Sequence, residues 1–255
     1  MRIGVCSNIE NIEEVENIGF DYIELSVSKI MDLSESDFSK AVEKVKKSKI
    51  KCEALNILFP KNMSLLGENV DREAVKTYIA GAMKRVSAIG GEVVVFGSGA
   101  SRKVPEGLEY NAAWKQLVDI TEMVGKEAAK YGITIVIEPL NKNETNIVNS
   151  VAEGLKLVKD VNHPNVKLLA DFFHMRVENE DMNIIGECKS YMKHTHIANG
   201  NGRVYPLSEN EDIYKEFFEK LKSIDYEGRL SIEGKTTQFN VDAPVSLALL
   251  KKLAE

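Results

Sequence analysis

The sequence has only three cysteines and fewer basic than acidic residues, which argues against a disulfide-stabilised protein and against a nucleic-acid-binding protein. The three cysteines, Cys6, Cys52 and Cys188, are widely spaced and form no CxxC pair. This usage is typical of reduced core thiols and predicts a cytoplasmic protein. Acidic residues outnumber basic ones, for a net charge of -6. A nucleic-acid partner usually requires a basic face, so none is expected unless a local basic groove exists.

Long apolar runs are also missing, so we expect no membrane-spanning segment. The opening residues "MRIGVCSN" already have the pattern of a strand and lack the apolar segment of a signal peptide. The chain has 255 residues, of which 44% are hydrophobic and 28% charged. Such a composition is globular, and the length suits one α/β barrel or two smaller domains.

Short apolar runs rich in β-branched residues alternate with longer amphipathic segments. Apolar residues recur every three or four positions in 71–90 and 111–131, as in helices with one buried face. Segment 151–161 follows Ser150 and carries Glu153, a capping-box pattern. Strands are expected at 2–7, 21–27, 50–59, 92–97, 133–138, 166–173, 192–198 and 229–234.

Eight strands alternating with helices predict parallel pairing with right-handed crossovers. The predicted fold class is α/β: a single (β/α)8 TIM barrel over residues 1–255, with its active site at the C-terminal rim of the strands. The alternative is a doubly wound open sheet, which usually has fewer strands. A phosphate-binding glycine loop after the first strand would favour that fold, but residues 7–14, "SNIENIEE", contain no glycine.

Charged and imidazole side chains stand at the ends of several predicted strands. The run "ITIVIE" ends in Glu138, a residue that is costly to bury unpaired. Strand ends converge in a barrel, and converging carboxylates repel one another unless they are protonated or bridged by a cation. A mixed oxygen and nitrogen set suits Mn²⁺, Mg²⁺, Co²⁺ or Zn²⁺, with the harder ions favoured. The strand-end residues are Glu24, Glu138, Asp171, His194, His196 and Glu233.

Four segments in order, "IEPLNKNE", "LLADFFHM", "HTHIANGNGR" and "SIEG", resemble the sugar isomerase/epimerase superfamily with the xylose isomerase-like TIM barrel. Within it, the pattern is most similar to ketose 3-epimerases and hydroxypyruvate isomerases. The resemblance implies one divalent metal ion, with Mn²⁺ as the expected ion, and a homo-oligomer (dimer or tetramer). It implies metal ligands at Glu138, Asp171, His196 and Glu233, catalytic acid–base roles for Glu138 and Glu233, and substrate contacts from Glu144, His174 and Arg203.

The implied chemistry begins with removal of a proton from the carbon next to a carbonyl. A divalent ion stabilises the resulting enediolate as a Lewis acid, and a carboxylate removes the proton. An epimerase returns the proton to the opposite face of the same carbon, whereas an isomerase returns it to the neighbouring carbon. We therefore expect a metal-dependent isomerase or epimerase acting on a small ketose or a keto-polyol.

Other functions are compatible with the same motifs. A keto-sugar or keto-inositol dehydratase or lyase would share the first step, and a catalytically degenerate barrel would only bind sugar. A DNA-repair endonuclease, another class on this barrel, is disfavoured because it requires three metal ions and several more histidines. This chain has no histidine before His163.

The loop after Arg203 and three polar residues near the motifs give further expectations. After Arg203 the chain reads "VYPLSENED", without the glycines that the resemblance predicts, so the loop over the substrate is expected to differ. Glu24 and His194 are expected to support the site rather than bind metal. By strand alternation His194 is expected on the opposite face from His196. Lys235 follows Glu233 directly and could touch the substrate, but a solvated loop position is the favoured expectation.

Overall fold

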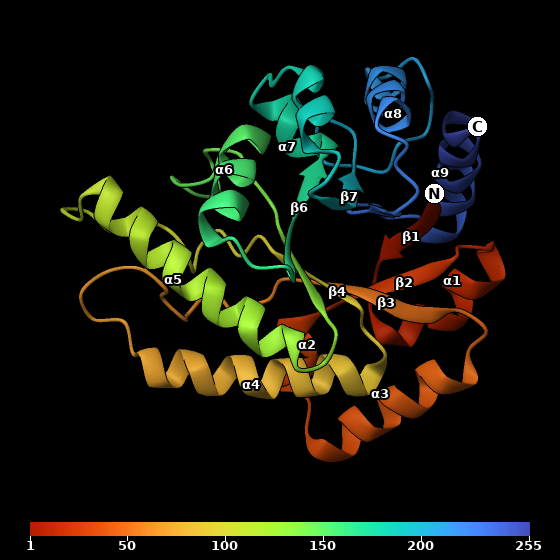
Figure 1. Ribbon diagram of the computed structural model, residues 1–255. Helices are drawn as coiled ribbons and strands as arrows, with labels where there is room; N and C mark the ends of the chain where they lie inside the picture. The colour runs from red at the N-terminus through yellow and green to blue at the C-terminus, as the bar shows by residue number, and fades with distance from the viewer.

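Eight parallel strands close into a barrel in the order of the sequence, with β8 paired to β1, in the computed structural model of residues 1–255. Closure leaves no exposed sheet edge. The helices surround the barrel, and the two termini lie near each other (Figure 1). The strands are β1 (Arg2–Cys6), β2 (Tyr22–Ser26), β3 (Lys51–Asn56), β4 (Val93–Phe96), β5 (Thr134–Ile137), β6 (Val166–Asp171), β7 (Met192–Ile197) and β8 (Arg229–Ile232).

The helices follow the strands as predicted, with short additional turns at the rim. They are α1 (Ile12–Ile18), α2 (Val27–Asp32), α3 (Glu35–Lys47), α4 (Arg72–Ile89), α5 (Tyr110–Ala129), α6 (Val151–Val161), α7 (Phe172–Val177), α8 (Tyr214–Ser223) and α9 (Phe239–Ala254), with 3-10 helices η1 (Ile9–Asn11) and η2 (Met182–Cys188). No helix combines the length and the apolar character needed to span a membrane.

Local signals in the sequence set the helix ends. The Ser150 hydroxyl accepts a hydrogen bond from the Glu153 backbone N–H at 3.1 Å. The Glu153 carboxylate accepts from the N–H of Asn149, the residue before the cap, at 2.6 Å, so the predicted capping box forms with its second bond shifted by one residue. Helix α4 ends at Gly90, whose φ of 96° is the left-handed conformation that glycine adopts without strain.

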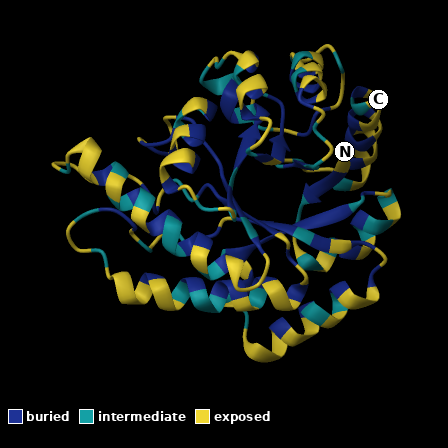
Figure 2. Cartoon of the chain, in the orientation of Figure 1, coloured by how far each residue is buried: buried dark blue, intermediate teal, exposed yellow.

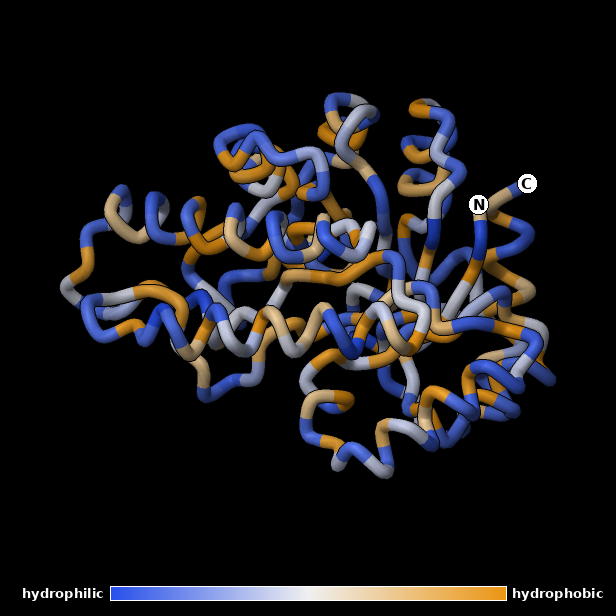
Figure 3. The backbone as a smooth tube through the Cα atoms, turned by 60° about the horizontal axis from the view of Figure 1, so that its bottom comes forward, coloured by the Kyte–Doolittle hydropathy of each residue, from blue (hydrophilic) through white to orange (hydrophobic).

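The core has two layers that are separated by the barrel wall. The apolar stripes of the helices cover the outside of the strands in a cluster of 65 buried residues. The strands are mostly buried (Figure 2), and the helices alternate apolar and polar residues along their length (Figure 3). A smaller cluster fills the barrel interior and consists of Tyr22, Ala54, Val93, Val95, Val136 and Leu169.

Above this apolar interior layer, at the C-terminal ends of the strands, lies a layer of polar side chains that continue the same inward-facing rows. Residues two positions apart on a strand point to the same face. Glu138 therefore follows the inward-facing Val136, and Asp171 follows Leu169. The (β/α)8 prediction is confirmed, and the side chains at the strand ends point into one space because they continue the inward-facing rows.

Candidate active site

Four side chains from β5 to β8 meet at the C-terminal rim of the barrel. Each of them offers one ligand atom, and these atoms all lie within 4.8 Å of one another. His196 Nδ1 is 3.1 Å from Glu138 Oε1 and 3.5 Å from Glu233 Oε2. Glu138, Asp171 and His196 are buried, and Glu233 is half-buried. The structure thus brings together the four residues that the sequence predicts as metal ligands.

The chemistry of this cluster fits a divalent cation. Asp171 Oδ1 accepts a hydrogen bond from the Phe173 N–H at 2.7 Å, whereas Asp171 Oδ2 is buried without a hydrogen-bond partner. Burial raises the pKa of Glu138, and the nearby negative charge of Glu233 raises it further. Burial likewise raises the pKa of Asp171. A divalent ion would relieve this repulsion and give Asp171 Oδ2 a partner, and three carboxylates with one imidazole make an oxygen-rich donor set.

Glu24, below this cluster, orients the imidazole of His196. Glu24 Oε1 lies 2.9 Å from His196 Nε2, and Glu24 Oε2 lies 2.8 Å from His194 Nε2. Because the carboxylate accepts from Nε2–H, His196 presents the Nδ1 lone pair to the cluster when the ring is neutral. Burial opposes the ionisation of Glu24, but the charges of His196 and His194 outweigh burial and hold its pKa well below the usual range.

The expected orientation of His194 is wrong. The His194 and His196 rings have centroids 4.9 Å apart, and both bond the same carboxylate. The reason is the period of the strand: side chains alternate at every residue, so positions 194 and 196 share the inward face. The expectation that Glu24 and His194 support the metal-ligand candidates agrees with this geometry.

Glycine at position 97 leaves room for the Glu138 carboxylate. A Cβ built on Gly97, which directly follows β4, would lie 2.1 Å from Glu138 Oε2. That oxygen is the far end of a flexible side chain, so an added methyl group would displace the carboxylate rather than the backbone. Gly97 therefore sets the position of one candidate metal ligand.

We expect Gly97→Ala to fold normally and to weaken Mn²⁺ binding by about 10- to 100-fold, as displaced supporting groups do at metal sites. Isothermal titration calorimetry would measure the affinity. Gly186→Ala is the matched control, since a Cβ at Gly186 would meet no atom within 4 Å. An unchanged affinity in Gly97→Ala would show that Glu138 does not hold the ion in this position.

A buried arginine that the sequence did not single out fixes the backbone at Glu138. Arg102 is 1% exposed and donates to the carbonyl oxygens of Phe96 at 3.0 Å and Glu138 at 2.7 Å. Burial lowers the pKa of Arg102 to about 10, so the guanidinium stays charged at neutral pH. It links the ends of β4 and β5 through main-chain acceptors. Such contacts leave no pattern in a sequence.

Asn56 was also missed, although it carried a usable signal. Its side-chain Nδ2 donates to Glu233 Oε1 at 2.8 Å. Asn56 is the last residue of β3, which makes it a polar group at a strand end like the predicted ligands. Together with Arg203, it holds the Glu233 carboxylate at the edge of the cluster.

His174 presents a hydrogen-bond donor to the site. His174 Nδ1 accepts from the Asn141 backbone N–H at 3.1 Å, so the neutral ring carries its proton on Nε2. His174 Nε2 has no hydrogen-bond partner and lies 3.6 Å from Asp171 Oδ2. Burial lowers the pKa of His174, which favours this neutral form. The side chain of Asn141 also donates to Glu144 Oε1 at 3.0 Å.

Arg203 reaches the same place in spite of the altered loop that follows it. Arg203 Nη2 pairs with the Glu233 carboxylate, and Nη1 lies 3.2 Å from Glu144 Oε1. The loop is anchored by the backbone: the Lys235 N–H donates to the Arg203 carbonyl at 2.7 Å. The guanidinium lies over the Phe173 ring, 4.9 Å from its centroid. The three predicted substrate-contacting residues, Glu144, His174 and Arg203, therefore surround the four candidate ligands.

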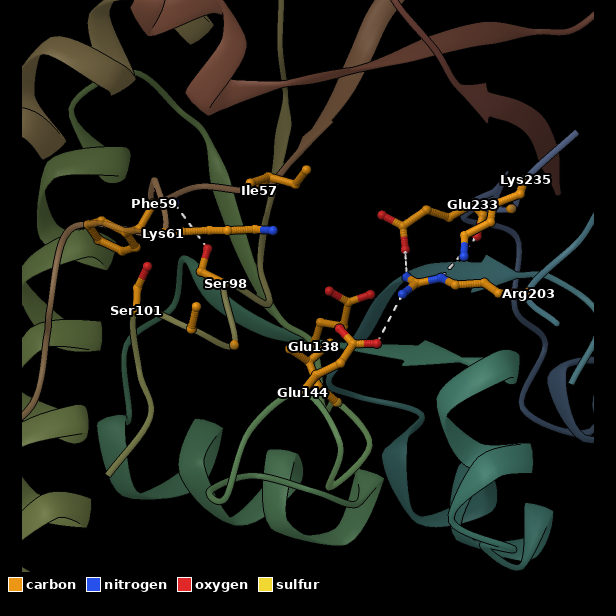
Figure 4. A pocket seen from close by; sticks show the side chains of 14 residues that line it. Ile57, Phe59, Lys61, Ser98, Ser101, Glu138, Glu144, Arg203, Glu233 and Lys235 are labelled. Carbon is orange, nitrogen blue, oxygen red and sulfur yellow. Dashed lines mark hydrogen bonds and ion pairs between the residues drawn. The ribbon is translucent and has the colours of Figure 1, made fainter. Parts of the chain in front are cut away.

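A cavity of about 550 Å³ opens directly above these residues. Figure 4 shows Glu138, Glu144, Arg203 and Glu233 at its base and on one side. The loops after β3 and β4, residues 57–61 and 98–101, form the other side. The volume is typical of pockets that bury small organic ligands.

Comparisons with known proteins identify relatives of this chain and solved structures with the same fold. D-psicose 3-epimerase from Ruminiclostridium cellulolyticum is 26% identical over 232 residues, which span 87% of this chain and 76% of that protein. L-ribulose 3-epimerase from Methylomonas sp. is 36% identical over 123 residues, covering 48% of this chain and 42% of that protein. The crystal structure of D-psicose 3-epimerase with D-tagatose, from Clostridium cellulolyticum, superposes with a TM-score of 0.88 over 100% of both chains, at 21% identity.

A family model described as xylose isomerase-like TIM barrel matches residues 12–253, almost the whole barrel. The resemblance inferred from the four sequence segments is confirmed. With its closed barrel and its row of polar strand ends, this chain belongs to the xylose isomerase-like TIM barrel family.

Proposed function

We propose that this protein is a divalent-metal-dependent sugar epimerase or isomerase that acts on a ketose or a related hydroxy-carbonyl compound. The observation that carries the proposal is the pair of carboxylates, Glu138 and Glu233, which lie 3.1 and 3.5 Å from His196 Nδ1 and line one cavity. The relatives named ketose 3-epimerases support a sugar as the substrate.

The proposed metal site consists of Glu138, Asp171, His196 Nδ1 and Glu233, with Mn²⁺ as the expected ion. When bound, the ion supplies Lewis-acid stabilisation of the negative charge that develops on the substrate oxygens. Glu24 keeps the His196 lone pair directed at this site, and Gly97 leaves the space that Glu138 requires.

The two glutamates are proposed to move the proton. One carboxylate takes the proton from the carbon next to the carbonyl, and the C–H electrons pass into the carbonyl to give an enediolate. The other glutamate, in its acid form, returns a proton to the opposite face of that carbon in an epimerase. Glu138 and Glu233 come from β5 and β8 and enter the cavity from different directions (Figure 4), as such a two-sided transfer requires.

His174, Glu144 and Arg203 are proposed to position the substrate. The Nε2–H of His174 has no protein acceptor and is free to donate to a substrate oxygen. Glu144 and Arg203 pair with each other beside it, at 3.2 Å, and offer an acceptor and a donor for hydroxyl groups. The homo-oligomer and the identity of the metal remain predictions.

The proposal is tested by incubating the Mn²⁺-loaded protein in D2O with a panel of ketoses, keto-inositols and hydroxypyruvate. We expect deuterium to enter at the carbon next to the carbonyl, and the exchange to stop when a chelator removes the metal. NMR of the products distinguishes an epimer or an isomer from the dehydrated product of a lyase. An absence of exchange with every compound would contradict the proposal and favour a barrel that only binds sugar.

A further inference from the structure

Two lysines in the cavity lack an acidic partner. Lys61 and Lys235 both line it, and neither side chain takes part in any of the ion pairs or side-chain hydrogen bonds found in the protein. The positive charge of the third cation, Arg203, is offset, because its guanidinium contacts the carboxylates of Glu233 and Glu144. The free positive charge of the cavity thus resides on the two lysines.

Lys61 approaches from the loop after β3. Its side chain extends across the cavity toward the middle, opposite the side that carries Glu233 and Arg203 (Figure 4). Ser98 lies beside it in the lining, and its Oγ accepts from the Phe59 backbone N–H at 3.0 Å. The hydroxyl proton of Ser98 therefore remains available, so an ammonium group and an O–H donor are presented on the same wall.

Lys235 lies on the other wall, directly after Glu233 and Gly234. Its backbone is held on both sides: its N–H donates to the Arg203 carbonyl at 2.7 Å, and its carbonyl accepts from the Tyr205 N–H at 3.3 Å. Lys235 is exposed, as expected from the sequence, but it also lines the cavity. A fixed backbone beside a proposed catalytic glutamate limits where its ammonium group can reach.

The charges of the site favour an anionic ligand. A divalent ion leaves one negative charge uncompensated among Glu138, Asp171 and Glu233. Glu144 and Arg203 neutralise each other, and the buried carboxylate of Glu24 and the buried guanidinium of Arg102 have opposite charges that cancel in the sum. The two lysines then give the loaded cavity a net positive charge. A neutral sugar has no group that would compensate for it, whereas a substrate with one acidic group does.

We propose that the cavity selects a ketose with an acidic group, a carboxylate or a phosphate, at the end remote from the reacting carbonyl, and that Lys61 and Lys235 hold this group. The proposal rests on the proposed sugar epimerase or isomerase function and specifies its substrate class. The proposed metal site binds the hydroxy-carbonyl end, and the acidic end extends toward Lys61 and Lys235.

The experiment compares three substrates that differ only at the terminal carbon: a neutral ketohexose, the ketohexuronate and the ketohexose 6-phosphate. Deuterium exchange by the Mn²⁺-loaded protein gives kcat/KM for each. We expect at least one acidic substrate to exceed the neutral one by about tenfold or more, since a hydrogen bond to a charged group contributes that much. The better of the two acidic substrates identifies the group as carboxylate or phosphate.

Substitution of each lysine tests whether the preference for an acidic substrate depends on Lys61 and Lys235. Lys61→Gln and Lys235→Gln should each reduce the acidic-to-neutral ratio of kcat/KM by up to about tenfold, mainly through KM. Lys103→Gln removes the same charge from an exposed position outside the cavity and should leave the ratio unchanged. Calorimetric titration of the Mn²⁺-loaded protein with the ketohexuronate and with the 6-phosphate should show weaker binding in the two cavity variants.

The outcomes separate the two proposals. Exchange with the neutral ketose and no preference for either acidic substrate would overturn the acidic-group site and leave the epimerase or isomerase proposal in place. If no ketose exchanges, the proposed function fails, and the titration still decides the acidic-group site. Binding of both acids that is equal in the wild type, Lys61→Gln and Lys235→Gln would overturn it.

Discussion

Replacing Glu138 or Glu233 by glutamine should slow solvent deuterium exchange into the substrate by about 10²- to 10⁴-fold, the effect of losing a general base. Glutamine keeps the shape of the side chain and an oxygen ligand but lacks the basic carboxylate. The metal should therefore remain bound, because Asp171, His196 and the remaining glutamate still hold it. Exchange measured by NMR at saturating Mn²⁺ separates this chemical loss from a loss of metal.

The two variants should differ from each other if the enzyme is an epimerase. Each glutamate faces one side of the carbon, so one variant should be slower with one epimer and the other variant with its partner. Glu53→Gln is a suitable control, because Glu53 pairs with Arg2 and Arg229 at the opposite end of the barrel. Wild-type exchange in both active-site variants would mean that the base lies elsewhere and that Glu138 and Glu233 are at most metal ligands.

The fold was predictable because its signals are local and repeated. Most strands are short apolar runs, and each main helix has one apolar stripe, so the number of alternating units indicated the barrel. The candidate ligands were predictable for a related reason. Glu138 and Asp171 continue inward-facing rows, and an ionisable residue at that point of a strand is conspicuous in the sequence.

The supporting groups could not be predicted in the same way. Arg102 acts on the carbonyl oxygens of Phe96 and Glu138, and any residue could supply those acceptors. Asn141 sets the tautomer of His174 through its backbone N–H, which carries no sequence information. Lys61 could not be assigned to the cavity from the sequence, because only closure of the barrel places the loop after β3 opposite Arg203. These contacts depend on long-range geometry rather than on local pattern.

Replacing Glu24 should have the second large effect, a loss of folding stability, because its carboxylate is a shared hydrogen-bond acceptor. It accepts hydrogen bonds from His194, His196 and Ser231 within the barrel interior. Glu24→Ala would leave the two buried imidazole donors without an acceptor, whereas Ser231 would keep the Tyr22 hydroxyl as a partner. Because breaking a buried ionic contact costs about 3–5 kcal/mol, we expect the free energy of unfolding to fall by about that amount in chemical denaturation.

Glu24→Gln is the more informative variant for the metal. An amide has one acceptor oxygen, so its NH2 group must face either His196 Nε2 or the pair formed by His194 and Ser231. In the first case the proton of His196 moves to Nδ1, the atom that lies 3.1 Å from Glu138 Oε1. In the second case His196 keeps its tautomer but loses the negative charge that makes it a better donor to a metal.

Both arrangements weaken the proposed metal site, so Glu24→Gln should lower Mn²⁺ affinity by about 10- to 100-fold, the usual cost of losing a carboxylate behind a histidine ligand. Calorimetry with Mn²⁺ measures it. Ser231→Ala removes one bond to Glu24 without touching either imidazole and should lower the affinity much less. An equal affinity in the wild type and in Glu24→Gln would mean that His196 is not a ligand, and the ion would then have to be held by the three carboxylates alone.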